Sequence, residues 1–167
     1  HPDPNWSGLM SYDDEHPGIG YAYPTAYNAL AVMGANTTGV TNMLNMLGSC
    51  SNMMRICPFD TSSVTNMYSM FHDCQALKKI PPMDTSHVTT MDYMFDTCTR
   101  ITSIPPMDTS NVTSMYAMFD SCIKLKNIPL LDTSNVTTME WMFANCPKLK
   151  TIPLLDTSKV TSMLKMF

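Results

Sequence analysis

The stretch DTSNVTSMYAMFDSCIKLKNIPLL, residues 108–131, decides the fold, because its pattern recurs along most of the chain every 24 residues. The same frame fixes one valine, one pair of methionines and one cysteine in each copy. These positions are Val40, Val64, Val88, Val112, Val136 and Val160; Met43/Met46, Met67/Met70, Met91/Met94, Met115/Met118, Met139/Met142 and Met163/Met166; and Cys50, Cys74, Cys98, Cys122 and Cys146. A period held over more than five copies without an insertion predicts a solenoid, in which each repeat packs on its neighbours.

The frame divides the chain into two parts. Residues 40–167 hold five full 24-residue units and a partial sixth. Residues 29–39 fit the frame loosely, with Val32 in the column of Ile80, and are predicted to form a degenerate first rung. We expect residues 1–28, rich in Pro and Tyr, to form an irregular cap, so that residues 1–39 cover the N-terminal end of the core. Since the chain starts without Met and stops within a repeat, we expect a mature or partial chain.

Two spacings alternate within each unit. Val112, Met115 and Phe119 follow a helical stripe, and the Asp-Thr-Ser before them supplies N-cap residue types. Leu125 and the apolar pair around Pro129 suit a short strand that proline ends. The predicted fold class is therefore α/β: 24-residue coils, each a short helix plus a short strand, stacked into a parallel sheet.

Composition excludes several classes of function. Of the 167 residues 44% are apolar and only 14% charged, and the formal net charge is −4. No segment has the basic excess of a nucleic-acid-binding protein. The longest stretch without Asp, Glu, Lys or Arg, residues 16–54, contains too many polar side chains for insertion into a membrane.

The cysteine column has one thiol per coil. Stacked cysteines lie within reach of one another, but their parallel Cβ vectors aim the sulfurs poorly for a disulfide. We expect Cys50, Cys74, Cys98, Cys122 and Cys146 to be buried free thiols at a bend, with three disulfides as the alternative. Cys57 has no partner in register.

Two other columns contain side chains of types that bind metal ions, but each column has a simpler explanation. The methionine pairs could bind copper, but they lie on the apolar stripe and are expected to form the core. The aspartate column could bind calcium; capping of the following helix explains it better. This column consists of Asp60, Asp84, Asp108, Asp132 and Asp156. The four histidines do not recur in a column, so zinc lacks support, and we predict no cofactor.

Two sets of side chains are candidate binding surfaces. Eight of the ten basic residues gather in a few columns, as either a solvated edge or a stripe for an anionic polymer. They are Arg55, Lys78, Lys79, Arg100, Lys124, Lys126, Lys148 and Lys150. A helical wheel places Tyr93 and Trp141 opposite the core, with Tyr68 and Tyr116 on the flank; exposed aromatic side chains are frequent interface anchors.

These residues resemble a known family. The stretches Asn111–Phe119 and Asn135–Met139, followed by the Cys and Leu-x-x-Ile positions, resemble the BspA-like leucine-rich repeats over residues 36–167. They are most similar to the bacterial surface-protein subtype with DTSNVT-x-M-x-x-MF-x-x-C repeats. The resemblance implies a leucine-rich-repeat solenoid and an extracellular location, on a cell surface or virion, since members include adhesins and bacteriophage virion proteins. It supplies no catalytic residues.

We therefore predict a non-enzymatic extracellular recognition or adhesion module that binds a protein or glycan through the solenoid surface. The alternative is a structural component of a virion, such as a capsid or tail decoration, or of a surface fibre or array. Its partners would then be neighbouring subunits. A His72-Asp73-Cys74 run could suggest a thiol nucleophile, but the other column cysteines lack a neighbouring His.

Overall fold

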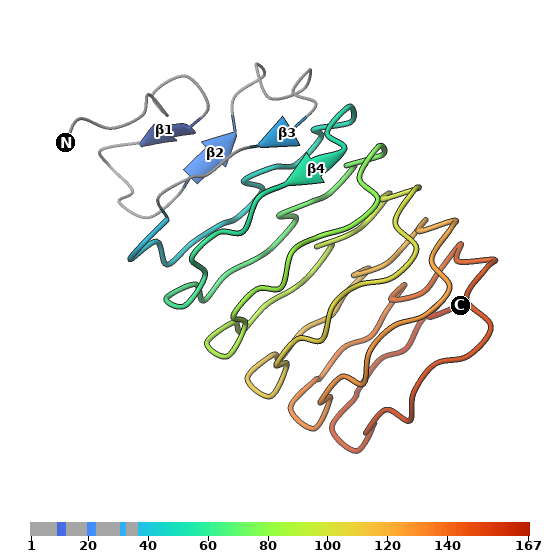
Figure 1. Cartoon of the computed structure of the whole chain (residues 1–167). Coiled ribbons are helices and arrows are strands. Elements are labelled where there is room, and N and C mark those ends of the chain that lie inside the picture. The colour runs from blue at the N-terminus through green and yellow to red at the C-terminus, as the bar shows by residue number, and fades with distance from the viewer. Residues whose placement is uncertain (1–9, 13–19, 23–30, 33–36) are drawn as a thin grey trace.

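The protein is described here from a computed structural model, which covers residues 10–12, 20–22, 31–32 and 37–167. From residue 37 on, the chain winds into coils of 24 residues that stack in one direction towards the C-terminus (Figure 1). We count positions in each coil from its valine, which is position 0. The coils are residues 40–63, 64–87, 88–111, 112–135 and 136–159, followed by the partial coil 160–167.

Regular strands are few and short. β1 (Met10–Tyr12) pairs antiparallel with β2 (Gly20–Ala22), and β3 (Ala31–Val32) pairs parallel with β4 (Arg55–Ile56). The register Val32↔Ile56 is a step of one repeat, so residues 31–32 follow the 24-residue frame. The rest of the predicted cap lies outside the described residues.

The remaining coils are joined by isolated parallel bridges rather than by a continuous sheet. Five of these bridges run along position +2, from Asn42↔Asn66 to Thr138↔Ser162, and another is Ser103↔Asn127. Stacking is parallel as predicted, but the short strand expected in every coil is reduced to single bridges over most of the described chain.

The predicted helix is wrong, because the described residues contain no helix. Residues at +3, +5, +7 and +9 donate their N–H to the next coil, as from Ser69 to the carbonyl of Asp92 at 2.9 Å. The intervening N–H groups bond three residues back, as from Met70 to Met67 at 3.2 Å. A helix would satisfy these N–H groups internally, so alternating turns are what allow the coils to bond to one another.

Left-handed backbone makes this alternation possible. Nearly every described coil has positive φ at positions +5 and +9, on side chains as large as Tyr93 (φ 56°) and Trp141 (φ 59°). Such conformations cost roughly 1–2 kcal/mol for a residue with a Cβ. The inter-coil hydrogen bonds hold these positions in place.

The core lies inside the stack, as the sequence predicts. Val64, Met67, Met70, Phe71, Cys74 and Leu77 are all fully buried, and the next coils repeat this pattern. The methionine pairs from Met43/Met46 to Met139/Met142 are buried too, so the prediction that they form the core is confirmed. Phenylalanine rings at position +7 stack from coil to coil with centroids 5.6–5.9 Å apart.

The C-terminal coil is open. Phe167 is 74% exposed and Met163 48% exposed, because no described coil stacks on their C-terminal side. Met166 is buried as part of the core cluster, and its carbonyl accepts a hydrogen bond from Phe143 N at 2.8 Å. No helix able to cross a bilayer occurs in the described part of the chain.

Candidate binding surfaces

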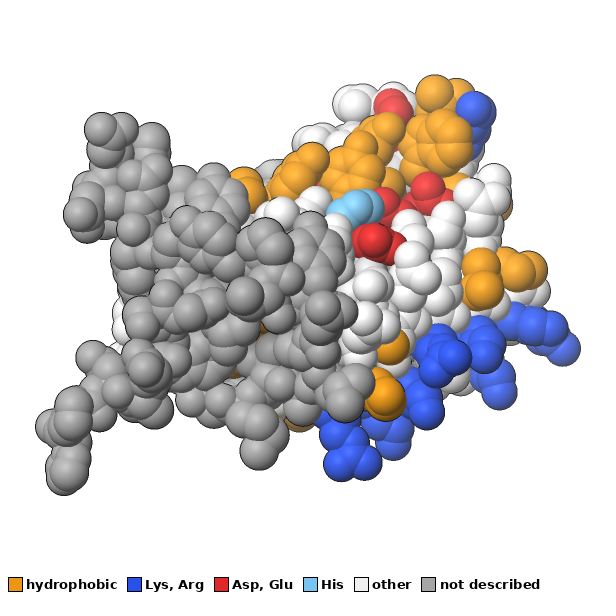
Figure 2. Space-filling view, turned by 90° about the horizontal axis from the view of Figure 1, so that it is seen from above, with side chains coloured by type: hydrophobic (Ala, Val, Ile, Leu, Met, Phe, Trp, Pro, Cys, Tyr) orange, Lys and Arg blue, Asp and Glu red, His pale blue; other side chains and the backbone are white. Residues whose placement is uncertain are grey.

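The four predicted aromatic residues lie in four successive coils at positions +4 and +5, and we call this set the aromatic ridge: Tyr68, Tyr93, Tyr116 and Trp141. The ring centroids of Tyr68 and Tyr93 are 5.5 Å apart, and those of Tyr93 and Tyr116 are 5.1 Å apart. Figure 2 shows apolar side chains gathered along this edge of the molecule. Burial, together with a hydrogen bond to Tyr116, raises the pKa of Tyr93 to about 12, so its hydroxyl stays protonated.

The ridge is less exposed than the helical wheel predicts. Tyr68 is exposed, whereas Tyr93, Tyr116 and Trp141 are half-buried, and Ala117 in the same column is only 2% exposed. The wheel fails because position +5 belongs to a turn with positive φ. Each of the three tyrosine rings also lies against a ring of a neighbouring coil, so these side chains contribute to packing as well as to the surface.

The ridge alternates between two adjacent positions, +4 and +5. Tyr68 and Tyr116 stand at +4, each followed by a small residue, while Tyr93 and Trp141 stand at +5, each preceded by an acid. The small residues are Ser69 and Ala117, and the acids are Asp92 and Glu140. This arrangement gives each ring room beside the ring of the next coil, and it repeats every two coils.

The two acids of the ridge are fixed by the coil that follows. Asp92 Oδ1 accepts hydrogen bonds from the Ser114 hydroxyl and, at 2.8 Å, from the backbone N–H of Tyr116. Glu140 Oε1 accepts one from the Ser162 hydroxyl. In the earlier coils an asparagine at +2 does part of this work, since Asn66 Oδ1 accepts from Tyr68 N. Sequence reasoning did not identify Asp92 and Glu140.

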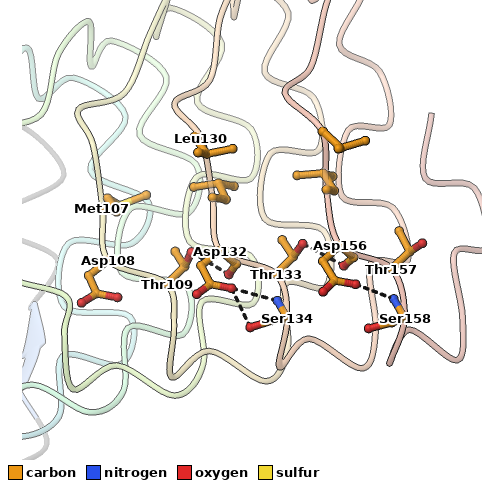
Figure 3. A pocket seen from close by; sticks show the side chains of 13 residues that line it. Met107, Asp108, Thr109, Leu130, Asp132, Thr133, Ser134, Asp156, Thr157 and Ser158 are labelled. Atoms are coloured by element: carbon orange, nitrogen blue, oxygen red, sulfur yellow. Dashed lines mark hydrogen bonds between the residues drawn. The ribbon is translucent and has the colours of Figure 1, made fainter.

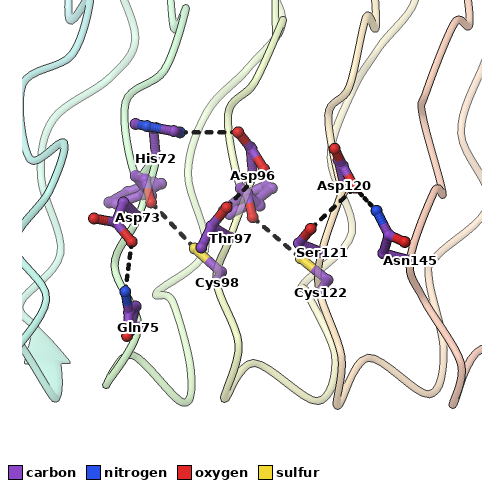
Figure 4. Close-up of polar contacts among 12 residues, drawn as sticks. His72, Asp73, Gln75, Asp96, Thr97, Cys98, Asp120, Ser121, Cys122 and Asn145 are labelled. Atoms are coloured by element: carbon purple, nitrogen blue, oxygen red, sulfur yellow. Dashed lines mark hydrogen bonds and ion pairs between the residues drawn. The ribbon is translucent and has the colours of Figure 1, made fainter.

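Asp73, Asp96 and Asp120, one in each of three successive coils, form what we call the acidic strip (Figure 4). His72 Nδ1 lies 3.0 Å from Asp96 Oδ2, and Asp120 Oδ1 accepts from Asn145 at 2.9 Å. The Asp96 hydrogen bond outweighs partial burial and raises the pKa of His72 above its usual 6.5. The pair joins neighbouring coils, and neither residue lies beside a reactive thiol.

The thiols of the cysteine column point to backbone carbonyls instead of to each other. The Sγ atoms of Cys74, Cys98 and Cys122 each donate to the carbonyl of the residue 27 positions earlier, at 3.1 Å. The five column cysteines are free thiols. Burial raises the pKa of Cys50 and Cys146 to about 11 and that of Cys98 well above its usual value. These groups are therefore protonated and unreactive near neutral pH.

The predicted basic residues also form a strip, which we call the basic row. All eight are exposed: Arg55, Lys78, Lys79, Arg100, Lys124, Lys126, Lys148 and Lys150. Figure 2 shows Lys and Arg side chains along an edge separate from the aromatic ridge, with largely uncharged side chains between the two. The two predicted sets of side chains thus form two separate strips in the structure.

The aspartate column borders an open groove of about 950 Å³ (Figure 3). Its apolar side includes Met107 and two exposed leucines, Leu130 (71%) and Leu154 (92%). Asp132 Oδ1 accepts from the N–H and the hydroxyl of Ser134, at 3.0 and 2.7 Å, and the same bonds occur at Asp60, Asp84 and Asp108.

The expected role of these aspartates needs correction, because no helix follows them. Each aspartate does accept a hydrogen bond from the backbone N–H two residues later, as in a helix cap. Here this bond stabilises a turn instead, and the turn is closed by a backbone bond such as Val136 N to Thr133 O at 3.0 Å. The bonds from Ser134 lower the pKa of Asp132 despite the neighbouring carboxylates Asp108 and Asp156, which raise it. Among the described residues, no group of three or more His, Cys, Asp or Glu could hold a metal ion.

Comparison with known proteins places this solenoid in a family. Residues 22–128 and 75–167 match the family described as "Mycoplasma protein of unknown function, DUF285". The chain belongs to the DUF285 family. The two matched ranges together span residues 22–167. This match agrees with the resemblance of the repeats to BspA-like leucine-rich repeats.

Solved structures similar to this DUF285 chain are leucine-rich-repeat proteins. One from Eubacterium ventriosum is 23% identical with a TM-score of 0.56, over 86% of this chain and 43% of its own length. Another from Bacteroides ovatus is 17% identical with a TM-score of 0.47, over 91% of this chain and 55% of its own length. The chain thus spans about half the length of these proteins. A comparison with curated proteins gives no match. The Eubacterium structure supports the solenoid fold.

Proposed function

We propose that this chain is a non-enzymatic extracellular recognition module, of the adhesion type, which binds a partner macromolecule through the aromatic ridge. The observation that carries the proposal is the set of four aromatic side chains in four successive coils, three of which are in ring contact at the surface of the stack. Tyrosine and tryptophan offer large contact area at low cost in side-chain entropy, and they are enriched among residues that dominate binding energy.

The position of the ridge supports this role. Its three tyrosines are held by ring contacts with neighbouring coils, and the backbone of Tyr93 and Trp141 donates inter-coil hydrogen bonds. A preformed surface loses little entropy on binding. The close similarity of the repeats to the DTSNVT-x-M-x-x-MF-x-x-C surface-protein subtype supports an extracellular location.

The state of the thiols supports a role other than catalysis. A cysteine nucleophile needs a depressed pKa, whereas burial raises the pKa of every thiol in the column. The His72–Asp96 pair bridges two coils, which gives it a structural role.

A binding screen tests the proposal. The purified chain is applied to arrays of extracellular proteins and glycans, alongside a variant with Tyr93→Asn and Trp141→Asn. Asparagine tolerates the positive φ of both positions, so the backbone is preserved. The matched control carries Lys124→Asn and Lys148→Asn in the basic row. We expect the ridge variant alone to lose its ligands; loss in the control alone would place the site on the basic row and contradict the proposal.

One observation favours the alternative, a structural part of a virion or surface array. Leu130 and Leu154 project from the groove beside the aspartate column, and exposed apolar side chains in a row suit contact with neighbouring subunits. Sedimentation and electron microscopy of the purified chain test it. Regular assemblies that disappear in a Leu130→Ser, Leu154→Ser variant would favour this function, whereas a monomer at high concentration would argue against it.

A further inference from the structure

A cation already occupies one end of the aromatic ridge. The Nζ atom of Lys165 lies 4.3 Å from the centroid of the Trp141 ring. Lys165 stands at position +5, the same position as Tyr93 and Trp141, one coil further on. An ammonium group within about 6 Å of an aromatic face is attracted by the ring quadrupole. The ridge therefore has the chemistry to hold an ammonium group against a ring.

The surroundings of the ridge are acidic. Asp92 and Glu140 lie within it, and three further carboxylates lie on the strip beside it, Asp73, Asp96 and Asp120. The basic row lies along another edge of the molecule (Figure 2). Charges that are separated in this way create a local negative potential although residues 40–167 are neutral overall.

The carboxylates within the ridge are oriented for a further contact. Both hydrogen bonds of Asp92, from Ser114 and from Tyr116 N, go to Oδ1. Glu140 Oε1 accepts from the Ser162 hydroxyl alone. Neither Asp92 Oδ2 nor Glu140 Oε2 takes part in these bonds, so each oxygen can accept a hydrogen bond from an incoming N–H donor.

We infer that the aromatic ridge binds a lysine-rich, extended segment of a partner protein, whose ammonium groups lie on the rings and between the carboxylates. This inference rests on the proposed function and names its partner. A polyanionic glycan is repelled by the acidic strip, and a neutral glycan would leave the segregation of charge unused. The contact between Lys165 and Trp141 is an example, within this chain, of the ammonium–ring contact that we infer for the partner's lysines.

The test uses fluorescein-labelled octalysine as the probe, with octaglutamate and the neutral cellohexaose as comparisons. Fluorescence polarisation measures the affinity of each peptide for the full chain at low ionic strength, and calorimetry measures cellohexaose. We expect octalysine to bind, octaglutamate to fail, and the affinity for octalysine to fall as salt rises. The Tyr93→Asn, Trp141→Asn variant should bind about tenfold more weakly.

Two further variants separate the ridge from general charge attraction. Asp92→Asn keeps an acceptor for Ser114 and Tyr116 but removes the charge, so it should weaken binding and reduce its salt dependence. Lys165→Asn frees the Trp141 ring and should tighten binding about threefold. Lys159→Asn makes the same change in net charge away from the ridge, beside Asn135, and should have a smaller effect. Circular dichroism and melting curves confirm that each variant is folded.

Three outcomes would overturn the inference. Octalysine that binds the ridge variant as well as the parent chain would place the attraction elsewhere, for example on the aspartate column. If Lys165→Asn and Lys159→Asn change the affinity for octalysine equally, net charge explains the change and the contact between Lys165 and the Trp141 ring does not. Ring-dependent binding of cellohexaose without binding of octalysine would reject the lysine-rich partner while leaving the ridge as a recognition surface. If no probe and no array ligand depends on the rings, the proposed function fails as well.

Discussion

Phe119 and Phe143, one coil apart, stack with their ring centroids 5.7 Å apart and their planes 2° from parallel. Phe119 is fully buried and stacks on Phe95 on its other side, at 5.6 Å. Phe167, at the end of the same column, stacks on Phe143 alone and is largely exposed. The same residue type at the same position thus occurs in two environments, which makes the column a measure of how stability varies along the stack.

Phe119→Ala should lower the free energy of unfolding by about 3–5 kcal/mol, as for other buried large-to-small changes. Phe167→Ala should lower it far less, because its ring has one neighbour and remains in contact with water. Chemical denaturation of both variants measures the difference. Equal losses would show that the last coil is covered in solution.

The positive φ of position +5 can be tested with two alanines that are equally buried. Ala117 has φ 50° and is 2% exposed, whereas Ala144 is 4% exposed and has no positive φ. Glycine relieves left-handed strain only at the first site, so Ala144→Gly should be more destabilising than Ala117→Gly by about 1–2 kcal/mol. Equilibrium unfolding in denaturant checks this difference, and a reversed order would contradict the backbone described here.

The buried thiols should be reduced and shielded. We expect an alkylating reagent to leave Cys98 unmodified in the folded chain, because it is fully buried and its pKa is raised by desolvation. After unfolding without reductant, all five column cysteines should be labelled, as measured by mass spectrometry. Masses that correspond to intact disulfides would overturn this account.

The His72–Asp96 pair predicts a pH dependence of stability. Because the folded pKa of His72 is raised, its contribution is fully present below the unfolded pKa of about 6.5 and is lost as pH rises through the folded value. Asp96→Asn should therefore destabilise the protein more at pH 5.5 than at pH 8.5. NMR titration of the His72 ring in both proteins measures the pKa directly; an unshifted value in the parent chain would refute the coupling.

Metal chelation should leave stability unchanged. The aspartates of the column are satisfied by serine N–H and hydroxyl groups, and these bonds keep their pKa values low without a cation. We expect the same melting temperature with and without EDTA. A fall of many degrees would show that calcium bridges the column, and Asp108→Asn, Asp132→Asn would then abolish the effect.

The repeat frame and the core could be predicted from the sequence, because burial requires the same apolar side chain in every coil. Val64, Met67 and Phe71 are buried where the 24-residue frame places them. The helix could not be predicted correctly, because a spacing of three and four residues also suits successive turns. Propensity gives no warning that Tyr93 and Trp141 adopt positive φ, since inter-coil hydrogen bonds override local preference.

The candidate surfaces were predicted in part. The residues of the ridge and the basic row were identified by column, but their separation onto different edges depends on the path of the coil. Asp92 and Glu140 were missed because position +4 holds an acid only in alternate coils, with Tyr68 and Tyr116 at the same position in the coils between. The alternation of aromatic and small residues at +4 and +5 is visible in the sequence and could have indicated that the two columns share one strip.

The ridge repeats every two coils, whereas the core repeats every coil. Unequal recombination between repeats that inserted or removed one 24-residue unit would therefore preserve packing, yet it would bring two like positions of the ridge next to each other. Tyr68 could then face another +4 tyrosine instead of Asp92 and Tyr93. Length variants that differ by an odd number of coils would fold equally well but present a different surface, so selection on binding would favour changes in pairs.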